Sequence, residues 1–371
     1  MSEVADAIRT FPIIYDITQR ELYRKVLDDL KNGTVKEIDT DLYEAYGNGL
    51  RKAVDTVLGE SEYGDEYFDM QMQMRANVSR FAAYKAYHAT QELKDVDPAD
   101  IDKKGKLILN KYNRWQAAEY NTAVARTRTA KQYHDFTYDP ISNELYPNIK
   151  WLPSRSASPR EAHRVFWNRV WAKNDPFWNS NTPGSLWNCK CDWEETDEPV
   201  TNGNPAGNMS AKGLEGNPAV TGEIFTDDCS YVKKGGGHFV TNFARNETIN
   251  RGRKLYGKHV SQIDENQQKI DIIFNSKSIS HFANDLLYDK KNWQKIELTN
   301  ILDTVLANST LVGYEKNTKV KEKPTHKYYL YYETKLADGT PLYISVYQNN
   351  VDLEYKFYAV SKTLRKTATR V

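Results

Sequence analysis

The sequence predicts an α+β protein of several domains, with a helical N-terminal region, an irregular aromatic-rich middle, and a C-terminal part of two helices followed by an antiparallel sheet. Three observations lead to this prediction. Apolar residues recur at helical spacing over much of residues 15–133. Five tryptophans gather among Pro and Gly turns between Arg160 and Trp193. After residue 263, two helical patterns precede strands whose apolar residues alternate.

Composition limits the class of protein. At 371 residues the chain is long enough for two or three domains. It contains no run of eighteen apolar residues and no basic start followed by an apolar run, so we expect neither a membrane span nor a signal peptide. Of its three cysteines, two are separated by a single residue, which argues against a secreted disulfide framework and fits a reducing cytoplasm.

Charge is distributed unevenly along the chain. Residues 1–230 carry 28 Lys and Arg against 36 Asp and Glu, whereas residues 231–371 carry 23 against 14. The basic C-terminal part suggests a polyanionic partner such as nucleic acid. A solvated surface with excess lysine explains the same charge, so both interpretations stay open.

Residues 1–135 form the predicted helical domain. Residues 15–58 predict two helices, because apolar positions recur every three or four residues and the Asn32-Gly33 pair separates them. Residues 66–93 and 106–133 predict two longer helices with few breakers. The many aromatic and methionine side chains of these helices are expected to pack between them.

Residues 136–232 form the predicted second domain, which contains the aromatic segment (residues 160–193). A short strand around Ile149 leads into it. His163, Cys189 and Cys191 are zinc-ligand types, and a C-x-C pair can place two thiolates on one ion. A structural zinc site needs four ligands, so one is still missing, and Cys229 or Asp175 could supply it. A metal-free aromatic core explains the same residues, so a structural zinc ion and a plain core both stay open.

Three motifs follow one another in the aromatic segment: Arg160-x-x-His163, Asp175-Pro-Phe-Trp178 and, after a Pro-Gly turn, Trp187-Asn-Cys-Lys-Cys191. In this order they resemble the Mu F-like minor head proteins of tailed bacteriophages. The resemblance covers about residues 10–232. It continues in four motifs: Met74-Arg-Ala-Asn-Val78, Glu119-Tyr-Asn-Thr-Ala-Val-Ala-Arg126, Gly213 to Gly222, and Phe225-Thr-Asp227.

Three positions depart from the family pattern. Gly184 stands in place of a second proline, Lys190 in place of an arginine, and Cys229 where relatives tend to have a histidine. The last difference exchanges one zinc-ligand type for another. The resemblance implies a protein of head morphogenesis located in the virion, and in the host cytoplasm during assembly or after injection. Its implied partners are the phage portal and capsid proteins.

Residues 233–262 are basic and begin with Lys233-Lys-Gly-Gly-Gly-His238, so we expect a hinge between domains. Residues 263–371 form the predicted α+β domain. Its first helix, 276–288, has an apolar face that includes Leu286 and Leu287, and its second helix is expected at 296–306. The expected strands are 328–334, 342–347 and 353–360, with an Asp338-Gly339 turn before the second and Tyr355, Phe357 and Ala359 on one face of the third.

Several residues of this domain stand in a recognisable order: Lys277-x-x-x-His281, Leu302 to Gly313-Tyr314, the Tyr-rich strand after His326, and Tyr358-Ala-Val-Ser361. Together with the element order, they resemble phage-borne nucleases of the barnase, EndoU, colicin and RelE superfamily. Such modules are often fused to Mu F-like proteins. The resemblance implies an endoribonuclease that requires no cofactor.

In metal-independent RNA cleavage a base takes the 2′-hydroxyl proton, a cation stabilises the phosphorane, and an acid protonates the leaving oxygen. His281 could be the base or the acid, Lys277 would hold the phosphate, and Tyr358 and Ser361 would complete the catalytic site. The expected nucleic-acid-binding side chains are His326, Lys327 and Lys356. Alternatively, His281 is a surface histidine and the tyrosines are sheet core.

Three functions are compatible with this sequence. The first is a phage minor head protein with a C-terminal ribonuclease effector. The second is a purely structural head protein whose C-terminal domain only binds nucleic acid or another virion protein. The third is a free polymorphic toxin. The nuclease requires that His281 and its partners converge on one basic surface, whereas a binding module does not.

Overall fold

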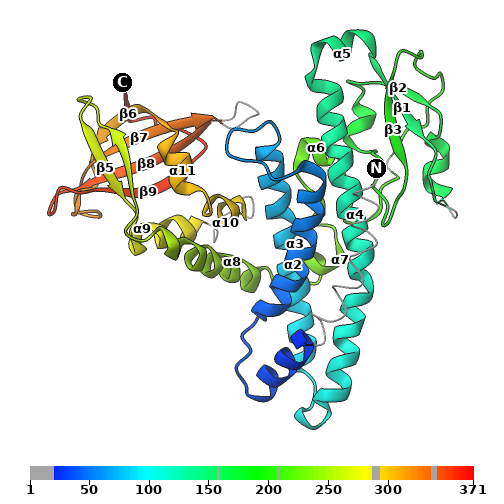
Figure 1. Cartoon of the computed structure of the whole chain (residues 1–371), viewed down its shortest axis with the longest axis horizontal. Helices are drawn as coiled ribbons and strands as arrows, with labels where there is room; N and C mark the ends of the chain where they lie inside the picture. Colours follow the sequence, from blue (N-terminus) through cyan, green and yellow to red (C-terminus); the bar gives the residue numbers. More distant parts are fainter. Residues whose placement is uncertain (1–20, 157–158, 160, 208, 286–292, 336–340) are drawn as a thin grey trace. The chain divides into compact units, whose positions relative to one another are not determined.

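The computed structural model describes residues 21–156, 159, 161–207, 209–285, 293–335 and 341–371. The chain forms two compact units (Figure 1), and each is treated separately below. Unit 1 comprises residues 1–60 and 73–240, and unit 2 comprises residues 61–72 and 241–371. The architecture is a multidomain α+β protein, as predicted. Among the described helices, none combines the length and the apolar character that crossing a membrane requires.

Unit 1 is built around long helices that run side by side (Figure 1). Residues 21–31 are helical and precede them. Asp39 caps α2 by accepting a hydrogen bond from the backbone N–H of Leu42 at 2.8 Å. Leu42, Leu50 and Val54 are buried on α2 at helical spacing, as the sequence predicted. The elements of this region are α2 (Thr40–Leu58), α3 (Phe68–Lys94), η1 (Pro98–Asp100), η2 (Ile101–Gly105), α4 (Lys106–Tyr138) and α5 (Pro140–Leu145).

The aromatic segment folds onto a three-stranded antiparallel sheet of order β2-β1-β3. Its core consists of large rings, and Trp171 stacks on Phe177 with centroids 4.1 Å apart. We expected one strand here, whereas β2 and β3 pair on either side of β1 because Trp171 and Trp193 turn inward beside Trp151. The elements are β1 (Asn148–Leu152), η3 (Glu161–Phe166), β2 (Val170–Ala172), η4 (Pro176–Asn179), β3 (Asp192–Thr196), α6 (Pro218–Thr221) and α7 (Ser230–Lys233).

Unit 2 is organised on a seven-stranded sheet of order β10-β6-β7-β8-β9-β5-β4. All its pairings are antiparallel except the parallel contact of β5 with β9. The strands are β4 (His259–Ile263), β5 (Lys269–Ile273), β6 (Thr310–Lys316), β7 (His326–Lys335), β8 (Pro341–Asn349), β9 (Tyr355–Ser361) and β10 (Thr369–Arg370). The helices are α8 (Gly237–Gly252), η5 (Arg253–Leu255), α9 (Ser276–Asn284), α10 (Gln294–Leu298) and α11 (Leu302–Ala307).

The two faces of this sheet bury different side chains. One face packs Ile272, Phe357 and other apolar residues against Ile279 and Phe282 of α9 and against α11. The opposite face carries a tyrosine layer that the C-terminal segment covers through Leu364 and Ala368. The layer consists of Tyr329, Tyr331, Tyr347 and Tyr358.

The structure differs from several expectations in this unit. The stretch 233–262, expected as a hinge, contains all of α8 and most of β4, and the boundary between the two units falls within it, after Val240. The expected helix 296–306 is divided into α10 and α11 where the backbone N–H groups of Asn300 and Ile301 donate to carbonyls only three residues back, those of Glu297 and Leu298. The expected positions Leu286, Leu287 and the Asp338-Gly339 turn lie outside the described residues.

Candidate functional site

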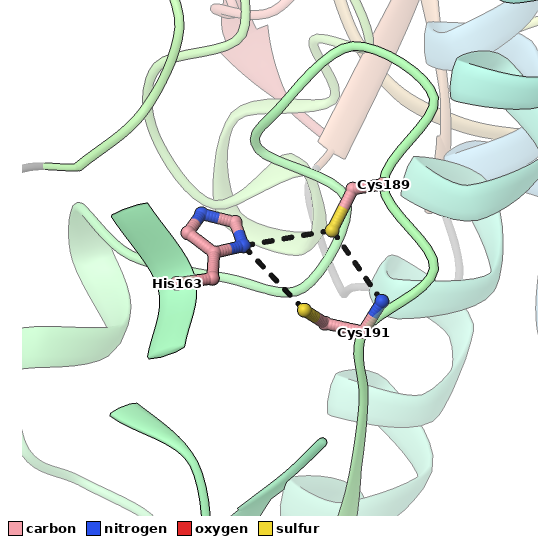
Figure 2. Close-up of side chains that lie close together, drawn as sticks. All are labelled: His163, Cys189 and Cys191. Atoms are coloured by element: carbon pink, nitrogen blue, oxygen red, sulfur yellow. Dashed lines mark hydrogen bonds between the residues drawn. The ribbon is translucent and has the colours of Figure 1, made fainter. Parts of the chain in front are cut away.

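The first candidate site is the His-Cys cluster, defined as His163, Cys189 and Cys191. His163 lies on η3, and its buried ring packs edge-on against Trp151 with centroids 5.1 Å apart. Its Nδ1 atom faces both sulfurs, at 3.5 Å from Cys189 Sγ and 3.6 Å from Cys191 Sγ (Figure 2). Its Nε2 atom lies 3.3 Å from the Ser185 hydroxyl, so both ring nitrogens have fixed surroundings.

The backbone before the cysteines is held in an unusual conformation. Asn188 has φ of 58°, in the left-handed region that asparagine tolerates better than most residues. Its backbone N–H donates to the Thr122 hydroxyl of α4 at 2.9 Å. The loop that carries Cys189 is therefore anchored to the middle of a long helix.

The electrostatics of the His-Cys cluster favour a cation. Hydrogen bonding with Cys191, aided by His163, lowers the pKa of Cys189, and the same interaction raises the pKa of Cys191. The thiol–thiolate hydrogen bond therefore favours one thiolate, and a second thiolate needs a cation beside it. Among the described residues, the buried indole N–H groups of Trp151 and Trp167 have no oxygen or nitrogen partner, and both favour the thiolate form of Cys191. These donors suit a sulfur that carries negative charge.

The geometry of the cluster fits zinc. The three ligand atoms lie within 4.8 Å of one another. Zinc bonds of about 2.0–2.1 Å to nitrogen and 2.3 Å to sulfur place tetrahedral N and S ligands about 3.5 Å apart. The observed separations of 3.5 and 3.6 Å match that spacing.

Neither residue suggested as the fourth ligand joins the cluster. Cys229 is buried at the start of α7 and packs against the backbone of Gly213 so closely that a Cβ there would lie 2.7 Å from the Cys229 Cβ. It lines a different cavity, beside Trp115. Asp175 instead caps η4 by accepting from the Phe177 N–H at 2.8 Å. Cys229, predicted as a metal ligand, therefore lies outside the His-Cys cluster.

The second candidate site is the His-Tyr cluster of unit 2, defined as His281, Lys323, His326, Tyr329, Tyr347 and Tyr358. Strand β9 contains a β-bulge at Tyr358. Val346 pairs with Phe357 and Ser345 with Ala359, so Tyr358 is an extra residue without a partner on β8. Phe357 faces the apolar core and Tyr358 faces the tyrosine layer, as alternation along a strand requires. Because of the bulge, Ala359 also packs with the tyrosine layer and not on the face expected from simple alternation.

Helix α9 packs against β9 and brings His281 to Tyr358. Asn275 caps the helix by accepting from the backbone N–H of Ser278 at 2.8 Å. Phe282 then meets Phe357 at 5.8 Å between centroids, and His281 meets Tyr358 at 4.1 Å. Successive residues of one helix thus contact successive residues of one strand, which fixes the imidazole over the phenol ring.

A tight turn brings Lys323 and His326 into the same cluster. The N–H of His326 donates to the carbonyl of Lys323 at 3.1 Å, with Pro324 at the second turn position. Asn350 holds this turn through its side-chain amide, which donates to the Pro324 carbonyl at 2.6 Å. The Lys323 ammonium hydrogen-bonds the Tyr358 hydroxyl and lies 4.5 Å from that ring's centroid.

The His326 ring is surrounded by tyrosines. It stacks on Tyr347 at 3.7 Å with an interplanar angle of 12°, and its Nδ1 lies 2.8 Å from the Tyr329 hydroxyl. Its centroid is 5.3 Å from that of Tyr358. Burial, with the charges of Lys323 and Lys277, lowers the pKa of His326 to about 4.

Burial also lowers the pKa of His281. Both imidazoles are therefore neutral at pH 7 and able to accept a proton. His281 Nδ1 is buried and has no hydrogen-bond partner among the described residues. Two neutral imidazoles, a phenol and a lysine ammonium thus meet around one ring, that of Tyr358.

The other predicted residues of this site are placed differently. The exposed Lys277 is near enough for its charge to lower the pKa of His326. Ser361 is exposed, and its hydroxyl donates to the Thr363 carbonyl at 2.8 Å. Lys356 forms ion pairs with Asp352 and, at 3.2 Å, with Glu354. The exposed Lys327 lies 6.0 Å from the ring of Tyr328, which packs against the face opposite the tyrosine layer.

Sequence reasoning missed Lys323, Tyr329 and Tyr347 as members of this site. The Lys323-Pro-Thr-His326 turn could have indicated the first, because Pro at the second position of a turn draws its ends together. Tyr329 and Tyr347 are direct cross-strand partners, which a single sequence does not reveal before the register of β7 and β8 is known.

The shifted pKa of His326 predicts that stability depends on pH. The folded state binds this proton less readily than the unfolded chain, whose histidine has a pKa of 6.5, so stability is present above pH 6.5 and falls as pH decreases toward about 4. We expect the thermal midpoint of unit 2 to fall over that range by less in His326→Gln than in the parent. Calorimetry of the full chain at stepwise pH measures this, and parallel curves for the two proteins would contradict it.

Comparison of the chain with family models, with curated proteins and with solved structures gives no match.

Proposed function

We propose that this chain is a minor head protein of a tailed phage and that its unit 2 is a metal-independent endoribonuclease. The observation that carries the nuclease is the His-Tyr cluster. His281 contacts Tyr358 from helix α9, and His326, 45 positions later in the sequence, contacts it from the start of strand β7. Lys323 hydrogen-bonds the hydroxyl of the same tyrosine. A tyrosine that only packs in a sheet needs neither an imidazole nor an ammonium group beside its ring.

The cluster contains a group for each step of RNA cleavage. A neutral imidazole, of His281 or His326, takes the proton of the 2′-hydroxyl as that oxygen attacks phosphorus. Lys323 and Lys277 offset the charge that develops on the phosphorane oxygens. The Tyr358 hydroxyl protonates the 5′ oxygen as the P–O5′ bond breaks. The products are a 2′,3′-cyclic phosphate and a free 5′-hydroxyl.

The head-protein assignment is supported by how the resembling motifs contact one another in unit 1. Asn77, from the first motif, donates to the Phe225 carbonyl at 2.9 Å and accepts from the Ile224 and Phe225 N–H groups. Arg126, from the long-helix motif, donates to the Leu214 carbonyl at 2.7 Å. Motifs far apart in sequence therefore form one hydrogen-bonded unit.

We propose zinc as the ion of the His-Cys cluster. When bound, zinc would stabilise both thiolates and join η3 to the loop before β3. His163 would ligate through Nδ1, the atom that faces both sulfurs, while Ser185 holds the other nitrogen. The indole groups of Trp151 and Trp167 would stabilise the Cys191 thiolate.

The nuclease is tested with the full-length protein, single-stranded RNA and tRNA, in excess EDTA. We expect cleavage with cyclic-phosphate ends, and no cleavage of matched DNA or 2′-O-methyl RNA, because these lack the attacking hydroxyl. Binding of RNA without cleavage would overturn the nuclease and favour a structural head protein with a nucleic-acid-binding domain. Cleavage that requires added metal would overturn the mechanism.

The zinc site predicts a sharp difference between cysteines. Cys189→Ser and Cys191→Ser should each weaken zinc binding at least about 100-fold, because even residues that only support metal ligands change affinity by 10–100-fold. The matched control is Cys229→Ser, which should keep one zinc per chain, since this thiol lies outside the cluster. Competition with a chromophoric chelator measures the affinities. Equal loss in all three variants would show that Cys229 is a ligand.

The structural role is tested in particles of the phage that encodes the chain. Mass spectrometry should find the protein in purified heads, and cross-linking should join unit 1 to the portal or the capsid protein. Its absence from mature particles that contain portal and capsid would exclude a virion protein and favour the free toxin.

A further inference from the structure

A metal in the His-Cys cluster would have one coordination position that the described protein does not fill. A structural zinc site is closed by four protein ligands, whereas sites that bind a further ligand have three and keep the fourth position open. Among the described residues, no His, Cys, Asp or Glu joins His163, Cys189 and Cys191. The neighbouring positions 157, 158 and 160 are Ala, Ser and Arg, which are not zinc-ligand types.

Space for a fourth ligand is present beside the cluster. All three ligand residues line one cavity of about 130 Å³. One water molecule needs about 10–15 Å³ of such space, so a small group larger than water fits. The rest of the cavity is lined by four polar residues and two apolar ones, which are Ser154, Ser156, Asn188, Lys190, Pro159 and Leu186.

The cavity favours an anionic oxygen donor. Lys190 is exposed and contributes a positive charge at the cavity wall. The serine hydroxyls and the Asn188 amide can donate hydrogen bonds to a ligand oxygen. A small carboxylate meets both conditions, since it can ligate the metal with one oxygen and accept hydrogen bonds with the other.

We infer that the His-Cys cluster is a three-ligand metal centre that binds a small carboxylate from solution at its fourth position, in place of water. This inference rests on the proposed metal site and extends it, since a purely structural zinc would be closed. The fourth ligand of the metal would therefore change with the concentration of small carboxylates around the folded protein.

The test replaces zinc by Co²⁺ in the full-length protein, because the visible spectrum of cobalt reports its coordination. We expect one Co²⁺ per chain, a spectrum typical of tetrahedral coordination with thiolates, and a saturable spectral change when sodium acetate is added. The variant Lys190→Leu removes the charge at the cavity wall without adding a possible metal ligand, and it should require at least about threefold more acetate.

The possible results distinguish a failure of the proposed metal site from a failure of carboxylate binding at that site. If the chain takes up no Co²⁺, the metal site itself fails. If it takes up one Co²⁺ and the spectrum does not change with acetate, the fourth position is closed and the inference is wrong. If Lys190→Leu responds to acetate as the parent does, the carboxylate does not bind against Lys190 in this cavity, and the inferred mode of binding is wrong.

Discussion

Replacement of His281 by alanine is expected to lower kcat/KM for RNA cleavage by about 10²–10⁴-fold, the usual contribution of a positioned acid–base group. The imidazole stacks over Tyr358 at 4.1 Å, and its lowered pKa keeps it neutral and able to accept a proton at pH 7. The measurement is initial cleavage rate of a labelled single-stranded RNA by the full-length variant.

The control for this variant is His259→Ala. His259 lies on β4 of the same unit, is exposed, and is outside the His-Tyr cluster. Its removal should change the rate by less than about twofold, which is within ordinary surface effects. Equal loss in both variants would indicate damage to folding, and equal activity of His281→Ala and the parent would remove His281 from the mechanism.

Replacement of Arg126 by alanine is expected to destabilise unit 1 by roughly 3–5 kcal/mol, the cost of breaking a buried charged network. The side chain is fully buried, yet its pKa falls only to about 10, so it stays protonated at pH 7. Its guanidinium donates to four backbone carbonyls, which would lose their donor. They belong to Leu214, Glu215, Gly216 and Glu223, at 2.7 to 3.2 Å.

The matched control is Arg128→Ala on the same helix. Its guanidinium is half-exposed and pairs with Asp192 at 2.9 Å, so its loss should cost at most about 1 kcal/mol. Urea unfolding followed by tryptophan fluorescence suits this comparison, because seven of the eight tryptophans lie in unit 1. If Arg126→Ala lowers the free energy of unfolding as little as the control does, water must take over the hydrogen bonds of the arginine to the four carbonyls.

Much of the fold follows from periodicity in the sequence. The apolar positions of α2 recur along one face, and the alternation of Leu342, Ile344 and Val346 places them in the core of unit 2. The strands β4 and β5 were not expected, since each is short and carries charged or polar residues at its outward positions. They are strands because β4 pairs with β5 and β5 pairs with β9.

For the candidate sites as well, some features follow from the sequence and others only from the structure. The C-x-C spacing and the lone His163 sufficed to predict the His-Cys cluster, because two ligands one residue apart must lie near each other. Cys229 was assigned to it wrongly, since a residue 38 positions beyond Cys191 can face any direction. His281 and Tyr358 were predicted from their residue types, but their contact depends on how α9 packs against β9.

The sequence by itself therefore determined the long helices of unit 1, the strands β7, β8 and β9, the aromatic core and part of the residues of each site, since these depend on spacing along a helix or strand. Only the tertiary structure decided that Lys323, Tyr329 and Tyr347 join His326, and that Cys229 stands apart from the other cysteines. The reason is physical. Strand register, a one-residue bulge and a turn each redirect a side chain to a different face, and the packing of the whole unit sets all three.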